Sequence, residues 1–160
     1  MPLTLFDQNT QLRHPNRLLV GVDEAGRGPL AGPVTACACH IPPALYGHPV
    51  MAQINDSKKI TPAKRKKIAA ELKMLPITYC LGFASSAEID AVNILQATFL
   101  AMRRALKKFE AKPVFALIDG NKTVPAINCP QQAVIGGDAS SLAVAAASIL
   151  AKVARDDFMD

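Results

Sequence analysis

Apolar residues along this chain fall into two patterns, short unbroken runs and longer series spaced three and four apart. Short apolar runs bounded by glycine, proline or acidic residues are typical of buried strands. They predict five strands, over residues 18–22, 34–41, 77–84, 114–118 and 131–135. The spaced series are typical of helices that bury one face. Because the two kinds of element alternate, the pattern predicts an α/β fold.

Polar capping residues mark where the helices begin. Thr61-Pro62 predicts an N-cap and a first helical turn, followed by a helix to about residue 75. Ser85 and Glu88 have the spacing of a capping box, which predicts a short helix to about residue 92. Two longer helices are expected to begin at Asn93 and near Ser140 or Ser141.

Two segments lack both patterns. Residues 1–17 are polar and rich in turn residues, so we expect a flexible leader there. Residues 44–54 contain Gly47 and Pro49 and predict a loop. The whole chain has 160 residues, half of them hydrophobic, which suits one domain with a sizeable core. We place that domain at residues 18–160.

Composition narrows the expected partners and compartment. The chain has 18 basic and 13 acidic residues, and its net charge of +5 suits a polyanionic partner. Its four cysteines contain no Cys-x-x-Cys pair and its three histidines lack metal-ligand spacing, so we expect reduced thiols in a cytoplasmic protein. The N-terminus has no uninterrupted apolar segment of the signal-peptide type, and no apolar run in the sequence is long enough to span a membrane.

Acidic residues follow three of the predicted strands. Asp23 and Glu24 end the first, Asp119 ends the fourth, and Asp138 follows the fifth, each beside glycine. A solvated acidic turn is the simpler interpretation of any one of them. However, the carboxyl ends of parallel strands meet at one edge of a sheet, where several acids can share a cation. Oxygen ligands without histidine or cysteine favour Mg²⁺ or Mn²⁺, and clustered carboxylates repel one another without a cation.

The segment from Gly21 to Val34 reads GVDEAGRGPLAGPV and resembles the N-terminal signature of ribonuclease HII, the prokaryotic type 2 ribonuclease H. Other segments resemble motifs of the same family. They are Asp56–Lys59, Asn93–Leu95, Ile118–Asn121, Gly137-Asp138 and Ala145–Asp156.

This resemblance implies a ribonuclease H-like fold, with a mixed five-stranded sheet flanked by helices. It implies hydrolysis of the RNA strand of RNA–DNA hybrids and cleavage at single ribonucleotides in duplex DNA, by two metal ions, leaving 5′-phosphate and 3′-hydroxyl ends. The implied catalytic and metal-binding residues are Asp23, Glu24, Asp119 and Asp138. The implied nucleic-acid-binding residues are Gly26, Arg27, Gly28, Lys58, Lys59, Asn93 and Asn121.

Within that set, Gly26-Arg27-Gly28 would contact the ribose 2′-hydroxyl, which distinguishes RNA from DNA. The lysine pair would lie near backbone phosphates. Asn93 would bind a phosphate, although helix capping explains this residue equally well.

The chain departs from the family pattern in two places. Gly136 stands where the family usually has lysine, and the C-terminal helical segment with its stacking tyrosine has no counterpart. We therefore expect the metal site to be kept, but the affinity for nucleic acid and the selectivity for the RNA-to-DNA junction to be impaired. Two alternatives stay open: a catalytically silent nucleic-acid-binding fragment, and another metal-dependent nuclease or phosphatase on the same fold. No membrane association and no obligate protein partner are expected.

Overall fold

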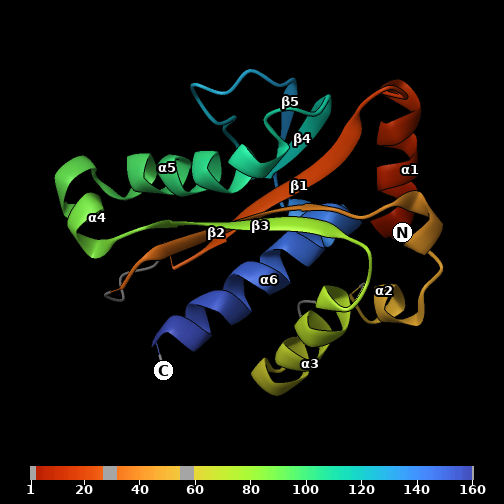
Figure 1. Ribbon diagram of the computed structural model, residues 1–160, viewed down its shortest axis with the longest axis horizontal. Helices are drawn as coiled ribbons and strands as arrows, with labels where there is room; N and C mark the ends of the chain where they lie inside the picture. Colours follow the sequence, from red (N-terminus) through yellow and green to blue (C-terminus); the bar gives the residue numbers. More distant parts are fainter. Residues whose placement is uncertain (1–2, 27–31, 55–59, 160) are drawn as a thin grey trace.

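The computed structural model describes residues 3–26, 32–54 and 60–159 (Figure 1). Its strands are β1 (Leu18–Ala25), β2 (Val34–His40), β3 (Thr78–Ala84), β4 (Val114–Asp119) and β5 (Gln131–Val134). Its helices are α1 (Leu3–Arg13), α2 (Pro49–Ile54), α3 (Pro62–Lys73), α4 (Ser86–Val92), α5 (Ile94–Leu106) and α6 (Leu142–Met159). Single 3-10 turns lie at Pro43–Leu45, Lys107–Phe109 and Gly137–Ala139. All five predicted strands are confirmed.

The strands form one mixed sheet in the order β3-β2-β1-β4-β5. β2 pairs antiparallel with both β1 and β3, whereas β1, β4 and β5 run parallel. Val22 of β1 lies opposite Ile118 of β4, and Asp119 lies opposite Val134 of β5. The carboxyl ends of β1, β4 and β5 therefore meet at one edge, which is the arrangement that the acidic strand ends require.

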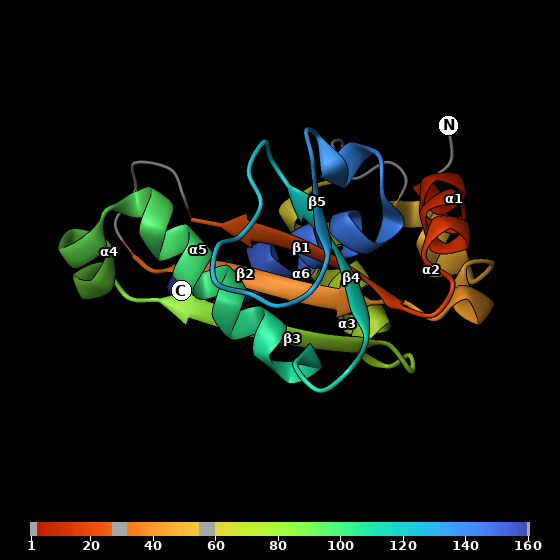
Figure 2. The same ribbon diagram turned by 90° about the horizontal axis from the view of Figure 1, so that it is seen from above.

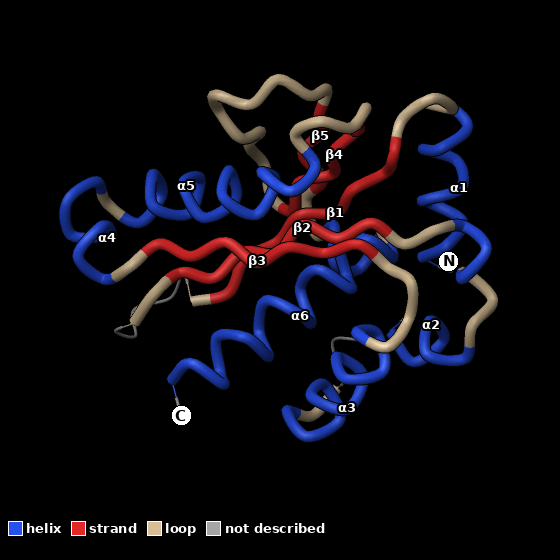
Figure 3. Tube along the Cα trace, in the orientation of Figure 1, coloured by secondary structure: helices blue, strands red, loops and turns tan. Residues whose placement is uncertain are grey.

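Helices cover both faces of the sheet. Figures 1 and 3 show α5 on one face and α6, with α2 and α3, on the other. Figure 2 shows α5 crossing obliquely over β2 and β3. Alternate residues of a strand point to opposite faces. Val20 and Val22 accordingly pack in the α5 core, whereas Leu19 packs with Val144 of α6. Burial on both faces explains why β1 is an unbroken apolar run.

The predicted helix starts are confirmed. The Thr61 side chain accepts a hydrogen bond from the Lys64 amide at 3.2 Å. Ser85 and Glu88 form a reciprocal capping box. Asn93, at a φ of 78°, caps α5 by accepting from the Gln96 amide at 3.0 Å.

The flexible leader expected over residues 1–17 is wrong for Leu3–Arg13, which forms α1. This helix has little amphipathic pattern, and a buried polar side chain joins it to the rest of the fold. Asp7 is fully buried, and its Oδ2 accepts a hydrogen bond from the Ala143 amide at 2.9 Å, at the start of α6. Asp7 and Ala143 are far apart in the chain, so no local sequence pattern predicts this contact.

The loop expected over residues 44–54 is also wrong, because Pro49–Ile54 forms α2. Pro49 occupies the first position of this helix, where its missing amide costs nothing. Val50 and Ile54 are fully buried in the core below the sheet. Proline here starts a helix instead of marking a loop.

Asp7 is expected to make stability depend on pH. Burial raises the pKa of Asp7 from 3.8 to about 6, although the Ser141 side chain and the amides of Ala143 and Leu142 lower it. As pH rises through this window, the unfolded chain loses the Asp7 proton before the folded protein does, so stability present at low pH is lost. Relative to Asp7→Asn, the wild-type free energy of unfolding should fall by roughly 3 kcal/mol and then level off.

Urea unfolding of both proteins in steps from about pH 3 to about pH 7 measures this difference. All other titrating groups contribute equally to both proteins, so their contributions cancel when the two free energies are subtracted. A difference that stays constant across the series would contradict the role given to Asp7.

Across the described residues, no helix is both long enough and apolar enough to span a bilayer.

Candidate metal and nucleic-acid site

Three carboxylates meet at the edge of the sheet where the parallel strands end. Asp23 and Glu24 come from the end of β1, and Asp119 is the last residue of β4. One carboxylate oxygen from each lies within 4.8 Å of the others. The structure thus brings together three of the four acids that the sequence marks as candidate metal ligands.

The strand register explains this meeting. Val22 and Ile118 are partners in the parallel β1–β4 pair, and the next residues along the two strands are Asp23 and Asp119. Both acids therefore leave the same edge side by side. Glu24 follows Asp23 near the end of β1, and one of its carboxylate oxygens completes the group of three.

The protein environment disfavours negative charge at Asp23. This residue is only 4% exposed. Burial raises the pKa of Asp23 well above its ordinary value, and the negative charges of Glu24 and Asp119 raise it further. The Glu24 amide donates a hydrogen bond to Asp23 Oδ1 at 2.8 Å, which lowers the pKa but does not offset the burial. A cation among these oxygens would relieve both the burial cost and the repulsion.

The donor set fits a hard divalent cation. Three carboxylates offer oxygen ligands alone, which Mg²⁺ and Mn²⁺ prefer over the nitrogen and sulfur ligands typical of zinc. Their separation allows one ion to contact all three. Asp23, Glu24 and Asp119 are thus the residues that would hold it.

Asp138 lies beside the cluster but its carboxylate does not join the described group of three. It sits in the 3-10 turn Gly137–Ala139 after β5, and its amide donates to Asp119 Oδ1 at 3.4 Å. A Cβ at Gly137 would lie 3.2 Å from the same oxygen, so glycine leaves space for Asp119. In this structure Asp138 holds Asp119 through its backbone.

A small cavity of about 80 Å³ opens beside the acids, against α5. Glu24, Asp119 and Asn121 line it, so Asn121 lies next to the cluster as a candidate substrate contact. Lys122 also lines this cavity, and sequence reasoning missed it. Its position directly after Asn121 was the available signal. An exposed cation here suits a phosphate that approaches the acids.

Gly26 follows β1 with a φ of 89°, a conformation that favours glycine. A Cβ there would overlap the Arg155 side chain, whose Nε donates to the Pro33 carbonyl at 3.3 Å. Arg155, near the end of α6, therefore joins the two sides of the turn. Sequence reasoning missed this role. The other predicted contacts Arg27, Gly28, Lys58 and Lys59 lie outside the described residues.

Asn93 is the predicted contact that the structure shows in another role, as a helix cap. It lies at the corner between α4 and α5 (Figure 1) and does not line the cavity beside the cluster. Its side chain accepts the hydrogen bond that caps α5. The capping interpretation is therefore observed.

Comparison with solved structures defines the class of protein. The ribonuclease H2 of Pyrococcus horikoshii OT3 matches with a TM-score of 0.72 and 29% sequence identity, over 88% of this chain and 73% of that chain. Bst-RNase HIII in complex with Mn²⁺ matches with a TM-score of 0.75 and 18% identity, over 89% of this chain and 53% of that one. The fold is ribonuclease H-like, as predicted.

Sequence comparison narrows this class further. The family model for ribonuclease HII matches residues 20–160, and the chain belongs to the ribonuclease HII family. Ribonuclease HII of Moorella thermoacetica is 52% identical over 141 residues, which cover 88% of this chain and 66% of that protein. Across the curated relatives compared, the chain spans between 52% and 70% of their length.

Proposed function

We propose that this chain is an endonuclease that hydrolyses the RNA strand of RNA–DNA hybrids and cuts at single ribonucleotides embedded in duplex DNA. The cluster of Asp23, Glu24 and Asp119, with oxygens within 4.8 Å of one another at the edge of the sheet, is the observation that carries this proposal. Family membership supports the substrate class. The four free cysteines support a reducing compartment such as the cytoplasm.

The chain's own residues would act in three ways. The carboxylates would hold Mg²⁺ or Mn²⁺, with Asp138 as a fourth ligand in the substrate complex. When bound, two such ions supply activation of the attacking water and stabilisation of the leaving 3′ oxygen, which gives 5′-phosphate and 3′-hydroxyl ends. Asn121 and Lys122 would orient the phosphate from the adjoining cavity.

Recognition of RNA would come from the turn after β1. Gly26, Arg27 and Gly28 would contact the ribose 2′-hydroxyl, and Arg155 would position that turn through Pro33. Lys58, Lys59 and Asn93 would contact backbone phosphates, with Asn93 using the part of its side chain that does not cap α5.

A panel of five substrates tests the proposal. It comprises an RNA–DNA hybrid, duplex DNA with one ribonucleotide, duplex DNA, duplex RNA and a small phosphate ester, each with Mg²⁺, Mn²⁺ or chelator. We expect cleavage of the first two substrates only, with either metal and not with chelator. Asp119→Asn is expected to abolish it, and mapping of the ends should find 5′-phosphates.

Two results would contradict the proposal. Binding of the hybrid without cleavage under either metal would favour the silent nucleic-acid-binding fragment, for which the position of the Asp138 carboxylate outside the cluster is the supporting observation. Cleavage of duplex DNA or of the phosphate ester would favour a different metal-dependent hydrolase.

A further inference from the structure

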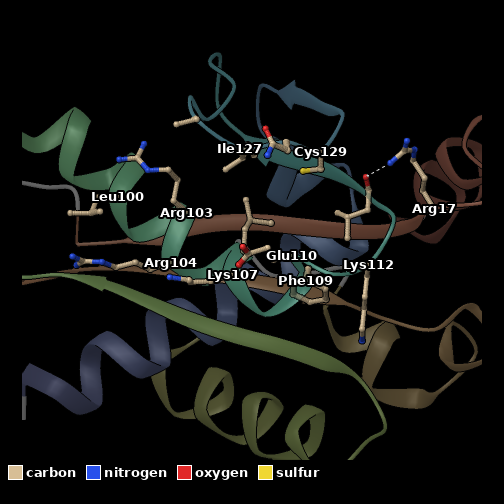
Figure 4. A pocket seen from close by; sticks show the side chains of 14 residues that line it. Arg17, Leu100, Arg103, Arg104, Lys107, Phe109, Glu110, Lys112, Ile127 and Cys129 are labelled. Carbon is tan, nitrogen blue, oxygen red and sulfur yellow. Dashed lines mark hydrogen bonds between the residues drawn. The ribbon is translucent and has the colours of Figure 1, made fainter.

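A second, larger cavity lies on the α5 side of the sheet, away from the acids. It has a volume of about 500 Å³, within the usual range for small-ligand sites. Figure 4 shows α5 and the turn after it on one side, the segment with Ile127 and Cys129 on the other, and Arg17 at one end. Arg17 precedes β1 and Val114 begins β4, so this cavity lies at the opposite ends of the two strands that carry the acids.

The charge of this cavity is strongly unbalanced. Five cations line it against one acid: Arg17, Arg103, Arg104, Lys107, Lys112 and Glu110. Among the described residues, Arg104 is the one of these cations with an ion-pair partner, Glu88 at 2.7 Å. Arg17 and Arg103 donate to backbone carbonyls, which leaves their charge uncompensated.

The two lysines that line the cavity are also available to bind an anionic ligand. Neither Lys107 nor Lys112 has an ion-pair partner within the described part of the chain. Both lysines are exposed, so they can reach a ligand at little structural cost. The cavity therefore attracts an anion at several points.

The floor of the cavity is apolar, which a simple anion does not need. The apolar lining residues include Leu100, Phe109 and Ile127, and Cys129 lines the same cavity. A ligand that combines a flat, weakly polar ring with a phosphate matches both features, because bases pack on apolar and guanidinium surfaces while phosphates pair with arginine and lysine.

We propose that this cavity, here called the α5 pocket, is a second binding site for a nucleoside phosphate, with the phosphate on the cations and the base on the apolar floor. The ligand is either a free mononucleotide or a nucleotide unit of a single strand. The site does not depend on the acid cluster, and it needs no metal.

Protection of Cys129 from alkylation tests the α5 pocket directly. The reaction with N-ethylmaleimide is followed by peptide mass spectrometry at mildly alkaline pH, because burial raises the pKa of the Cys129 thiol. Chelator is present throughout, so that the acid cluster cannot bind through metal. Cys80, half-buried on β3 and outside the pocket, is the internal control in every sample.

The probes are AMP, a short single-stranded oligonucleotide and inorganic phosphate. At millimolar concentration, AMP, the oligonucleotide or both should slow Cys129 alkylation at least about fivefold, with Cys80 unchanged. AMP alone would identify a free nucleotide as the ligand, and protection by the oligonucleotide would identify a strand. Equal protection by inorganic phosphate would overturn the proposal, because the apolar floor would then contribute nothing.

Two charge reversals complete the test. Arg103→Glu and Lys107→Glu should each abolish the protection, whereas Lys66→Glu, an exposed change on α3 below the sheet, should not. All three variants should cut the RNA–DNA hybrid at the wild-type rate, which separates this site from the proposed nuclease activity. Absence of protection by both nucleotide probes in the wild-type protein would refute the α5 pocket as a nucleotide site.

Discussion

Asp23→Asn is expected to lower the rate of RNA–DNA hybrid cleavage about a thousandfold or more. The same substitution should make the metal-free protein more stable. Burial and two neighbouring carboxylates raise the pKa of Asp23 well above its ordinary value, so the charge that would bind a metal weakens the fold without one. Asparagine removes the charge and can still accept the Glu24 amide hydrogen bond at Oδ1. Activity and stability should therefore change in opposite directions.

The stability gain should depend on pH and on metal. Because the folded pKa of Asp23 is raised, the wild-type protein loses stability as the pH rises above the ordinary aspartate value, and the variant does not. Thermal unfolding in chelator should show this gap widening, with about 2–4 °C for each kcal/mol. Added Mn²⁺ should raise the wild-type Tm and leave the variant nearly unchanged.

Asp90→Asn, an exposed change of the same chemistry on α4, is the matched control and should alter neither activity nor Tm. If Asp23→Asn were less stable than the wild-type protein in chelator, the Asp23 carboxylate would stabilise the folded state, contrary to this prediction. If Asp23→Asn still cut the hybrid at the wild-type rate, Asp23 would not be a catalytic residue.

The sequence predicted the acid cluster as far as strand geometry determines it. Asp23 and Asp119 each end an apolar run, and parallel pairing of those runs places the two side by side. Asp138 is different, because it follows β5 in a 3-10 turn. The direction of a side chain in such a turn depends on a few backbone angles, and neighbouring residues do not specify them through any repeating pattern.

Long-range contacts explain what the sequence did not predict. Asp7 fixes α1 to the start of α6, and Arg155 of α6 reaches the carbonyl of Pro33. The α5 pocket likewise combines residues before β1, on α5 and after β4. In each case the partners are distant in the chain, so local periodicity and capping rules give no information about them.

Gly21→Ala is expected to lower the free energy of unfolding by about 3 kcal/mol or more. Gly21 lies within β1 where α6 crosses it, and an added Cβ would lie 2.5 Å from the Ala143 carbonyl oxygen and closer still to the Ala143 carbonyl carbon and the Val144 amide nitrogen. These are backbone atoms, which cannot turn aside as a flexible side chain can. The Asp7 hydrogen bond to the Ala143 amide fixes the helix at this same point.

Gly47→Ala is the matched control, because a Cβ at that position would meet nothing within 4 Å. It should leave the urea midpoint unchanged or raise the stability by about 0.4–1 kcal/mol through a less flexible unfolded chain. If the free energy of unfolding of Gly21→Ala were instead within about 0.5 kcal/mol of the wild-type value, α6 would not pack on β1 as closely as the structure shows. Because Asp23 lies two residues further along β1, displacement of the strand by Gly21→Ala should also weaken Mn²⁺ binding, and Gly47→Ala should not.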